Sequence, residues 1–259
     1  MVCPTCGVHY LTPFRSEQEI AEFFAQRFAK GLEQDRINVF RRVARYIQEK
    51  KKNGGCILDI GCAGGLFLDQ FSVARGWTAY GIELSEGPGR AAQAKGLHVA
   101  IGTLESATLA PGSCDVITIL DSFYYFQEPR RELGTAFRLL KPDGLLIIEI
   151  PLGTARLWRT SGAGRMFRGA SVPAVEGMHN YFYAPESLSL LLGASGFRVL
   201  EIRPLPANQR SQIPQKILYQ LYSGISQVLW ALSGGGINVG PRVLVAATPD
   251  SPAKERGIA

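Results

Sequence analysis

The sequence predicts an α/β fold in which helices cover both faces of a mostly parallel, seven-stranded sheet. Apolar runs of strand length alternate along most of the chain with stretches whose apolar residues recur at helical spacing, and this alternation is typical of such sheets. Local signals for helix ends agree with it. Ser16 and Glu19 form a capping box before the first amphipathic stretch, and Lys141-Pro142-Asp143-Gly144 predicts a turn that stops a helix.

The elements follow one another in the order that a parallel sheet needs. Two amphipathic helices come first, one with Ile20 and Phe24 and the other with Phe40 and Val43 on its apolar face. We expect strands at residues 56–60, 78–83, 98–101, 115–120, 145–150, 197–203 and 243–247. Helices are expected at residues 66–74, 87–95, 130–140, 185–196 and 217–232.

Composition and charge place the chain among ordinary globular proteins. Its 259 residues are 46% hydrophobic and 19% charged, which excludes wholesale disorder and a small disulfide scaffold. The net charge is +6, but the basic residues are scattered, so we expect no nucleic-acid partner. No apolar run is long enough to span a membrane, no leader is recognisable, and the five cysteines are an odd number. These features predict a cytoplasmic protein.

Changes of pattern divide the chain into a main domain and smaller segments. Residues 1–15 contain a cysteine pair, residues 16–53 form a helical cap, and residues 54–249 form the main domain. Within it, residues 151–184 are rich in Gly, Arg and aromatic residues and predict a lid or substrate-facing insertion, while residues 205–236 predict an amphipathic helical insertion. Residues 250–259 are a polar tail.

The strongest functional signal is a glycine-rich turn after an apolar strand. The segment Ile57-Leu58-Asp59-Ile60-Gly61-Cys62-Ala63-Gly64-Gly65 leads from this strand into a helix, and its glycines leave the backbone bare for a ligand. Glu83 ends the next apolar strand, 18 positions after Gly65. This is close to the offset of roughly 20 residues at which a carboxylate binds ribose hydroxyls. The two features together indicate an adenosine-containing cofactor.

The spacing of the glycines separates two classes of cofactor. A dinucleotide-binding turn has the pattern G-x-G-x-x-G, whereas Gly61, Ala63 and Gly65 alternate here behind Asp59. This turn resembles the first motif, D-x-G-x-G-x-G, of class I S-adenosylmethionine-dependent methyltransferases, from which Ala63 departs at the middle glycine. A nicotinamide-dependent oxidoreductase is the alternative, because such an enzyme would share the turn and Glu83.

The resemblance covers about residues 54–197. Over this range the chain is similar to the ubiquinone-biosynthesis-like subgroup of methyltransferase domains. Gly102-Thr103-Leu104-Glu105 resembles the loop that the family places beside the adenine. Residues 179–188 resemble the H-x-x-x-x-T-P-E-S-L stretch of the subgroup, with Ala184 in place of Thr. Tyr124-Tyr125 stand where many relatives carry Glu-His, so the acid–base roles of those relatives are not transferred.

The resemblance implies a Rossmann-like fold that binds S-adenosylmethionine and transfers its methyl group to an O, N or C atom of a small-molecule acceptor. The implied cofactor site is Asp59, Gly61, Cys62, Ala63, Gly65, Glu83, Leu84, Thr103, Leu104 and Asp121. A noncatalytic protein that binds the same cofactor is a second alternative, because of the altered Tyr124-Tyr125 pair.

Four residues are candidates for the acceptor side. Tyr124, Tyr125 and Tyr181 either form the substrate wall or fill space beside the sheet. His179 is the candidate general base, because an unperturbed imidazole titrates near neutral pH and this one lies in an aromatic-rich segment. Its alternative role is that of a structural histidine.

Two peripheral features leave open questions about partners. Cys3-Pro4-Thr5-Cys6-Gly7 resembles one knuckle of a zinc ribbon, but a structural zinc site needs four ligands, so we expect no bound metal. A similar start in some sugar-modifying methyltransferases suggests a sugar or glycolipid precursor as acceptor. The apolar stripe through residues 213–232 either packs on the domain or on a second copy in a homodimer, or contacts a membrane surface peripherally.

Overall fold

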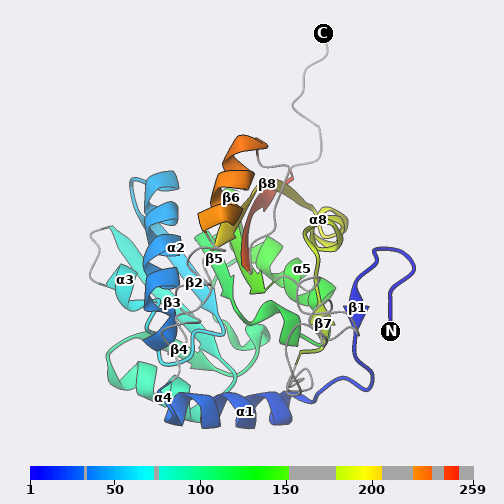
Figure 1. Cartoon of the computed structure of the whole chain (residues 1–259). Helices are drawn as coiled ribbons and strands as arrows, with labels where there is room; N and C mark the ends of the chain where they lie inside the picture. Colours follow the sequence, from blue (N-terminus) through cyan, green and yellow to red (C-terminus); the bar gives the residue numbers. More distant parts are fainter. Residues whose placement is uncertain (32–33, 73–75, 152–178, 206–223, 235–241, 251–259) are drawn as a thin grey trace.

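A sheet of seven strands runs through the protein in the order β4-β3-β2-β5-β6-β9-β8 (Figure 1). The computed structural model describes residues 1–31, 34–72, 76–151, 179–205, 224–234 and 242–250. Neighbouring strands from β4 to β6 are parallel, and β9 is antiparallel to both of its neighbours. The strands are β2 (Gly55–Ile60), β3 (Trp77–Glu83), β4 (His98–Ile101), β5 (Cys114–Leu120), β6 (Leu140–Pro151), β8 (Phe197–Leu205) and β9 (Arg242–Pro249). The predicted fold class is confirmed.

Helices cover both faces of this sheet, as Figure 1 shows. Ile57 and Leu58 point to opposite faces because side chains alternate along a strand. Ile57 shares its buried cluster with α2, α3 and α4, whereas Leu58 shares its cluster with α5 and α8. The helices are α1 (Glu17–Ala29), α2 (Ile37–Lys50), α3 (Asp69–Ser72), α4 (Glu86–Ala94), α5 (Pro129–Leu139) and α8 (Pro185–Ala194), with short 3-10 helices η1 (Gln34–Arg36), η2 (Leu104–Ser106) and η3 (Phe123–Tyr125).

Two local predictions differ from the structure. The helix after the glycine turn was expected from residue 66, but α3 begins at Asp69. Tight turns that bury Phe67 and Leu68 take up the intervening residues. The expected turn at residues 141–144 lies within β6, where the pairing with β5 shifts register between Cys114 and Val116, so an irregularity in the strand replaces a separate turn.

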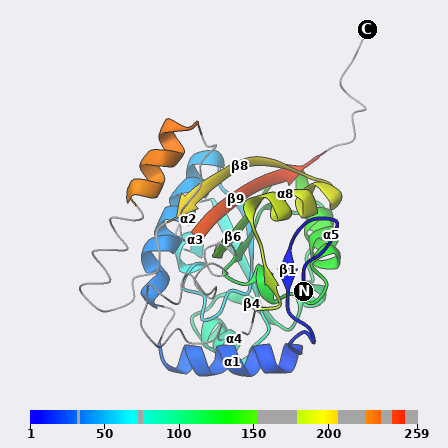
Figure 2. The same cartoon turned by 45° about the vertical axis from the view of Figure 1, so that its right-hand side comes forward.

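The amino-terminal residues pack onto the main sheet domain. β1 (His9–Tyr10) pairs antiparallel with β7 (Tyr181–Phe182), and the expected capping box of Ser16 and Glu19 begins α1. Helix α1 then crosses one end of the sheet (Figure 2). The hydroxyl of Ser85, after β3, donates to the carbonyl of Ala21 at 2.7 Å and fastens α1 there.

A helix over residues 224–232 lies against the edge strand β8. The indole Nε1 of Trp230 donates to the carbonyl of Ile202 at 2.8 Å, while Ile225, Val228 and Leu232 are exposed. In the described parts of the chain, no helix has the length and apolar character needed to cross a bilayer. A peripheral membrane contact or a homodimer through residues 213–232 stays a prediction, and residues 213–223 lie outside the described residues.

Most of the expected insertions also fall outside the described residues. The predicted lid at 151–184 is described only at its ends, and the insertion at 205–236 only at residue 205 and from residue 224 to 234. Of the tail, only Asp250 is described. The division of the chain into these segments therefore remains a prediction.

Candidate cofactor and acceptor site

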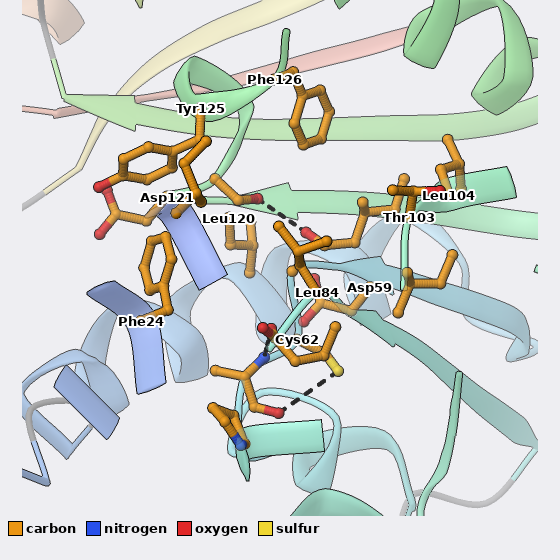
Figure 3. A pocket seen from close by; sticks show the side chains of 18 of the residues that line it. Phe24, Asp59, Cys62, Leu84, Thr103, Leu104, Leu120, Asp121, Tyr125 and Phe126 are labelled. Carbon is orange, nitrogen blue, oxygen red and sulfur yellow. Dashed lines mark hydrogen bonds between the residues drawn. The ribbon is translucent and has the colours of Figure 1, made fainter. Parts of the chain in front are cut away.

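A pocket lies at the carboxyl ends of β2, β3, β4 and β5, where parallel α/β sheets bind their ligands (Figure 3). Nine of the ten residues expected to bind the cofactor line it, and Gly65 does not. A Cβ at Gly65 would lie 2.2 Å from Cδ1 of Leu97, so this glycine allows the turn to pack against the chain before β4. Helix α1, η1 and the start of α2 contribute Glu17, Ile20, Phe24, Arg27, Phe28, Arg36 and Phe40 to the wall.

The glycine turn after β2 is held by the end of β3. The amide groups of Gly61 and Cys62 both donate to the carbonyl of Ile82, at 2.8 and 3.0 Å. Gly61 has a φ of 80°, and a Cβ there would lie 2.9 Å from the Ser122 side chain. Ala63, which replaces the family's middle glycine, has a φ of 47° in the left-handed region that favours glycine. The turn thus keeps the glycine-type backbone although one glycine is missing.

Glu83 joins this turn to the end of β3. This residue is 5% exposed, and its two carboxylate oxygens accept from the amides of Ala63 and Ser85, each at 2.8 Å. Burial raises the pKa of Glu83, and the hydrogen bonds from Ser85 and Ala63 oppose this rise. Each carboxylate oxygen can accept a second hydrogen bond, so Glu83 can still bind two ribose hydroxyls.

Asp59 and the residues after β4 line other parts of the pocket. Asp59 is 2% exposed, and the hydroxyl of Thr118 donates to its Oδ1 at 2.6 Å, which fixes the carboxylate. Leu84, which follows β3, and Thr103 and Leu104, which come shortly after β4, also line the pocket and are labelled in Figure 3. The apolar Leu84 and Leu104 provide surfaces on which a planar base can pack.

Asp121, directly after β5, is surrounded by charged groups that the sequence analysis did not place there. Its carboxylate contacts the guanidinium groups of Arg36 and Arg242 and the hydroxyl of Tyr124. Burial would raise the pKa of Asp121, but the charges of Arg242 and Arg36 outweigh burial and hold this pKa well below its usual range. Arg36 lines the pocket, yet it lies in η1, outside every recognisable motif, so the sequence held no signal for it.

The four candidates for the acceptor side are not all brought to the pocket. Tyr125 lines it and meets Phe24 of α1 edge-on, with ring centroids 4.9 Å apart. Tyr124, Tyr181 and His179 lie instead around a separate small void. The imidazole of His179 is 5% exposed and stacks on the Tyr124 ring at a centroid distance of 3.9 Å. This geometry favours the structural alternative for His179.

Glu132, on α5, is a pocket-lining residue with a shifted pKa. Burial, together with the charge of Glu105, raises the pKa of Glu132 on α5 to about 7. The nearby Arg131 acts in the opposite direction, but it is itself paired with Glu105 and Glu128. Glu132 therefore changes its charge near neutral pH. Glu132 could not be singled out from the sequence, because its raised pKa results from tertiary packing.

The cysteine pair near the amino terminus was expected to bind no metal. Cys3 and Cys6 lie on the turn of the amino-terminal hairpin, where the amide of Gly7 donates to the carbonyl of Cys3 at 2.9 Å. Within the described portions of the chain, no three His, Cys, Asp or Glu side chains come together in a way that could hold a metal ion. The expectation of no bound metal stays a prediction.

The fold and this pocket define a class of protein. A mostly parallel sheet with one antiparallel strand beside its edge, a glycine turn after the first strand and a carboxylate ending the second are the features of an S-adenosylmethionine-dependent methyltransferase. The chain belongs to the methyltransferase domain family, whose profile matches residues 32–202.

Bacterial relatives support the same class. The chain is 27% identical over 164 residues to the ubiquinone biosynthesis O-methyltransferase of Pseudomonas fluorescens strain Pf-5, a match that covers 60% of this chain and 69% of that protein. The enzyme of the same name from Cupriavidus pinatubonensis is 28% identical over 170 residues, which cover 62% and 67% of the two chains. The protein is therefore an S-adenosylmethionine-dependent methyltransferase, and neither the oxidoreductase nor the noncatalytic alternative is favoured.

Solved structures share the fold at low sequence identity. A possible histamine N-methyltransferase from Thermotoga maritima has a TM-score of 0.55 at 21% identity, over 88% of this chain and 99% of that one. The [4+2]-cyclase SpnF has a TM-score of 0.61 at 16% identity, over 93% of this chain and 99% of that one. Because such different reactions share the architecture, these structures carry information on the fold alone.

Proposed function

We propose that this methyltransferase acts on a hydroxyl group of a small molecule that enters the pocket beside Tyr125. The observation that carries the methyl-transfer part of the proposal concerns the cofactor: the amide of Ala63, in the glycine turn, donates to the buried Glu83 at 2.8 Å. A carboxylate fixed against a bare turn is suited to a ribose. Oxygen is preferred as the methylated atom because the two bacterial relatives are named as O-methyltransferases.

The described residues fit the parts of the cofactor. Glu83 would hold the ribose hydroxyls, and Leu84 and Leu104 would contact the adenine. The turn at Gly61 would face the amino-acid end, where Asp59 suits its ammonium group. Arg36 is a cation suited to its carboxylate, because the buried Nε of Arg36 has no hydrogen-bond partner among the described residues. When bound, the cofactor supplies a methyl group on a sulfonium sulfur.

The contribution of the protein would be mainly to orient the acceptor and exclude water. Holding a nucleophile in line with the methyl group can supply about 7–11 kcal/mol of the barrier in favourable cases. Phe24, Phe28, Phe40 and Tyr125 form an aromatic wall that suits an apolar or aromatic acceptor. Tyr124 is excluded as a base at neutral pH, since burial and the charge of Asp121 raise its pKa far above the usual value.

The proposal is tested by supplying methyl-labelled S-adenosylmethionine with matched acceptors. A catechol, an aliphatic alcohol and a primary amine are compared, with release of S-adenosylhomocysteine and transfer of label measured together. We expect the wild type to place the label on the catechol oxygen. Glu83→Gln should lose this labelling, and the exposed Glu86→Gln control should keep it. Label on the amine alone would overturn the choice of oxygen, and no binding of S-adenosylhomocysteine would overturn the cofactor site.

A further inference from the structure

Four charged side chains form a closed ring beside the pocket. Arg36, Asp121, Glu149 and Arg242 are called the charge ring here, and each arginine contacts both carboxylates. The Arg36 guanidinium lies 2.5 Å from Oε2 of Glu149 through one terminal nitrogen, and its other terminal nitrogen contacts Asp121. Arg242 contacts Glu149 through Nε and Asp121 through a terminal nitrogen. The ring therefore links η1, the ends of β5 and β6, and the start of β9.

The charge ring is neutral as a whole and almost removed from solvent. The side chains of Glu149, Arg36 and Arg242 are 0%, 9% and 10% exposed, and that of Asp121 is 20% exposed. Buried charges are tolerated when they are paired, but a hydrophobic cluster of similar volume would often be at least as stable. Stability alone therefore gives no reason for four ions at this position.

The ring has a pocket side and a rear side. Arg36 and Asp121 line the pocket, whereas Glu149 and Arg242 are outside its lining. Glu149 and Arg242, the rear pair, hold both terminal nitrogens of Arg36. Glu149 contacts one of these nitrogens directly, and Arg242 contacts the Asp121 carboxylate that contacts the other. The Nε of Arg36 remains without a partner among the described residues and is buried. A planar guanidinium whose two terminal nitrogens are held presents the N–H of its third nitrogen, Nε, in one orientation.

We propose that Glu149 and Arg242 are positioning residues that hold Arg36 in the orientation needed to bind the carboxylate of the cofactor's amino-acid end. This inference rests on the proposed function, because it assigns the partner of Arg36 in the same pocket. Without the rear pair, Asp121 alone would hold the Arg36 guanidinium, which could then rotate. Binding of the adenosine end, which depends on Glu83 and the glycine turn, would not change.

The experiment compares the binding of two ligands that differ at the amino-acid end. S-Adenosylhomocysteine has the amino-acid carboxylate, whereas 5′-methylthioadenosine lacks it and keeps the adenosine and the sulfur. In Arg242→Gln and Glu149→Gln, we expect affinity for S-adenosylhomocysteine to fall by about tenfold or more, as for loss of a well-oriented charged hydrogen bond. Affinity for 5′-methylthioadenosine should stay at the wild-type value. Arg198→Gln, on the exposed surface of β8, is the matched control.

Equal losses for the two ligands would mean a general structural role and overturn the inference, and so would unchanged binding of both. A single variant leaves an unbalanced buried charge and can fail to fold. The double variant Arg242→Gln/Glu149→Gln keeps Arg36 paired with Asp121 and is then measured in the same way. If this variant binds S-adenosylhomocysteine like the wild type, the inference is wrong. If the wild type binds neither ligand, the proposed function fails first, and the two failures are thus distinguished.

Discussion

The two sides of the pocket hold their own charged side chains in different ways. On the side of β2, β3 and β4, the charged groups are two buried carboxylates: Asp59, to which the Thr118 hydroxyl donates, and Glu83, whose oxygens are held by main-chain amides. On the side of β5, β6 and β9, four charged side chains neutralise one another around Asp121. The first side depends on the shape of the main chain, and the second on ion pairs between distant segments.

This difference affects how each side responds to mutation. The first side is formed by residues 59–63 and 83–85, so its geometry is largely local once β2 and β3 pair. The second side joins Arg36 to Glu149, 113 positions away, and Arg242 to Asp121, 121 positions away. Changes on the first side should alter cofactor binding through the backbone, whereas changes on the second should depend on charge balance.

The largest combined effect, on both stability and cofactor binding, is expected for Gly61→Ala. A Cβ at Gly61 would lie 2.9 Å from the Ser122 side chain, in a backbone conformation with a φ of 80°. We expect unfolding to become easier by about 2 kcal/mol and binding of S-adenosylhomocysteine to weaken. Gly87→Ala is the control, because no atom lies within 4 Å of a Cβ there. Chemical denaturation measures both variants, and equal stability of the two would show that the turn is not constrained.

His179→Ala tests whether the acceptor side includes a base. Because His179 stacks on Tyr124 at a separate void, we expect its removal to cost about 2 kcal/mol of stability through lost packing. Turnover below the melting temperature, with cofactor saturating, should be retained. The exposed His98→Ala is the matched control. A loss of turnover in folded His179→Ala, with cofactor affinity unchanged, would restore His179 as the general base.

Glu132 should make stability depend on pH. Burial raises its pKa from 4.5 to about 7, so between these values the folded state binds more protons than the unfolded state. Stability therefore falls as the pH rises through this range, and Glu132→Gln removes the fall. Since the carboxylate is partly exposed, the expected effect is modest. Relative to the wild type, the free energy of unfolding of Glu132→Gln should be about 1 kcal/mol more favourable to the folded state at pH 8 than at pH 4.

Thermal unfolding of Glu132→Gln at these two pH values measures this difference, and the exposed Glu49→Gln on α2 is the control. A difference from the wild type that is the same at both pH values would contradict the raised pKa.

The smallest effect is expected for Ala63→Gly. Ala63 has a φ of 47°, a conformation that costs an L-residue roughly 1 kcal/mol relative to glycine, although glycine loses part of this advantage through unfolded-chain entropy. We expect a gain of at most about 0.5 kcal/mol with unchanged cofactor binding. Denaturant titration of Ala63→Gly against Gly87→Ala would detect it, and a clear loss of stability would show that the methyl group of Ala63 is needed.

The sequence was most informative where function is built from neighbouring residues. The turn after β2 and Glu83 could be predicted because glycine, an apolar strand and a terminal carboxylate leave a local pattern, and their contact follows from parallel pairing of β2 with β3. The charge ring could not be predicted, because Arg36, Asp121, Glu149 and Arg242 meet only through the strand order of the folded sheet. His179 was a candidate general base because it lies in an aromatic-rich segment. In the structure, its imidazole stacks on the ring of Tyr124 at a separate void.

The most direct test is a calorimetric titration of S-adenosylhomocysteine into the wild type, Glu83→Gln and the exposed Glu86→Gln. NADH, the ligand of the alternative oxidoreductase class, is titrated separately into the same proteins. We expect one saturable site for S-adenosylhomocysteine in the wild type and in Glu86→Gln, roughly 100-fold weaker binding in Glu83→Gln, and no binding of NADH. Equal affinity in all three proteins, or tighter binding of NADH, would contradict the claim that the turn and Glu83 bind the adenosine of S-adenosylmethionine.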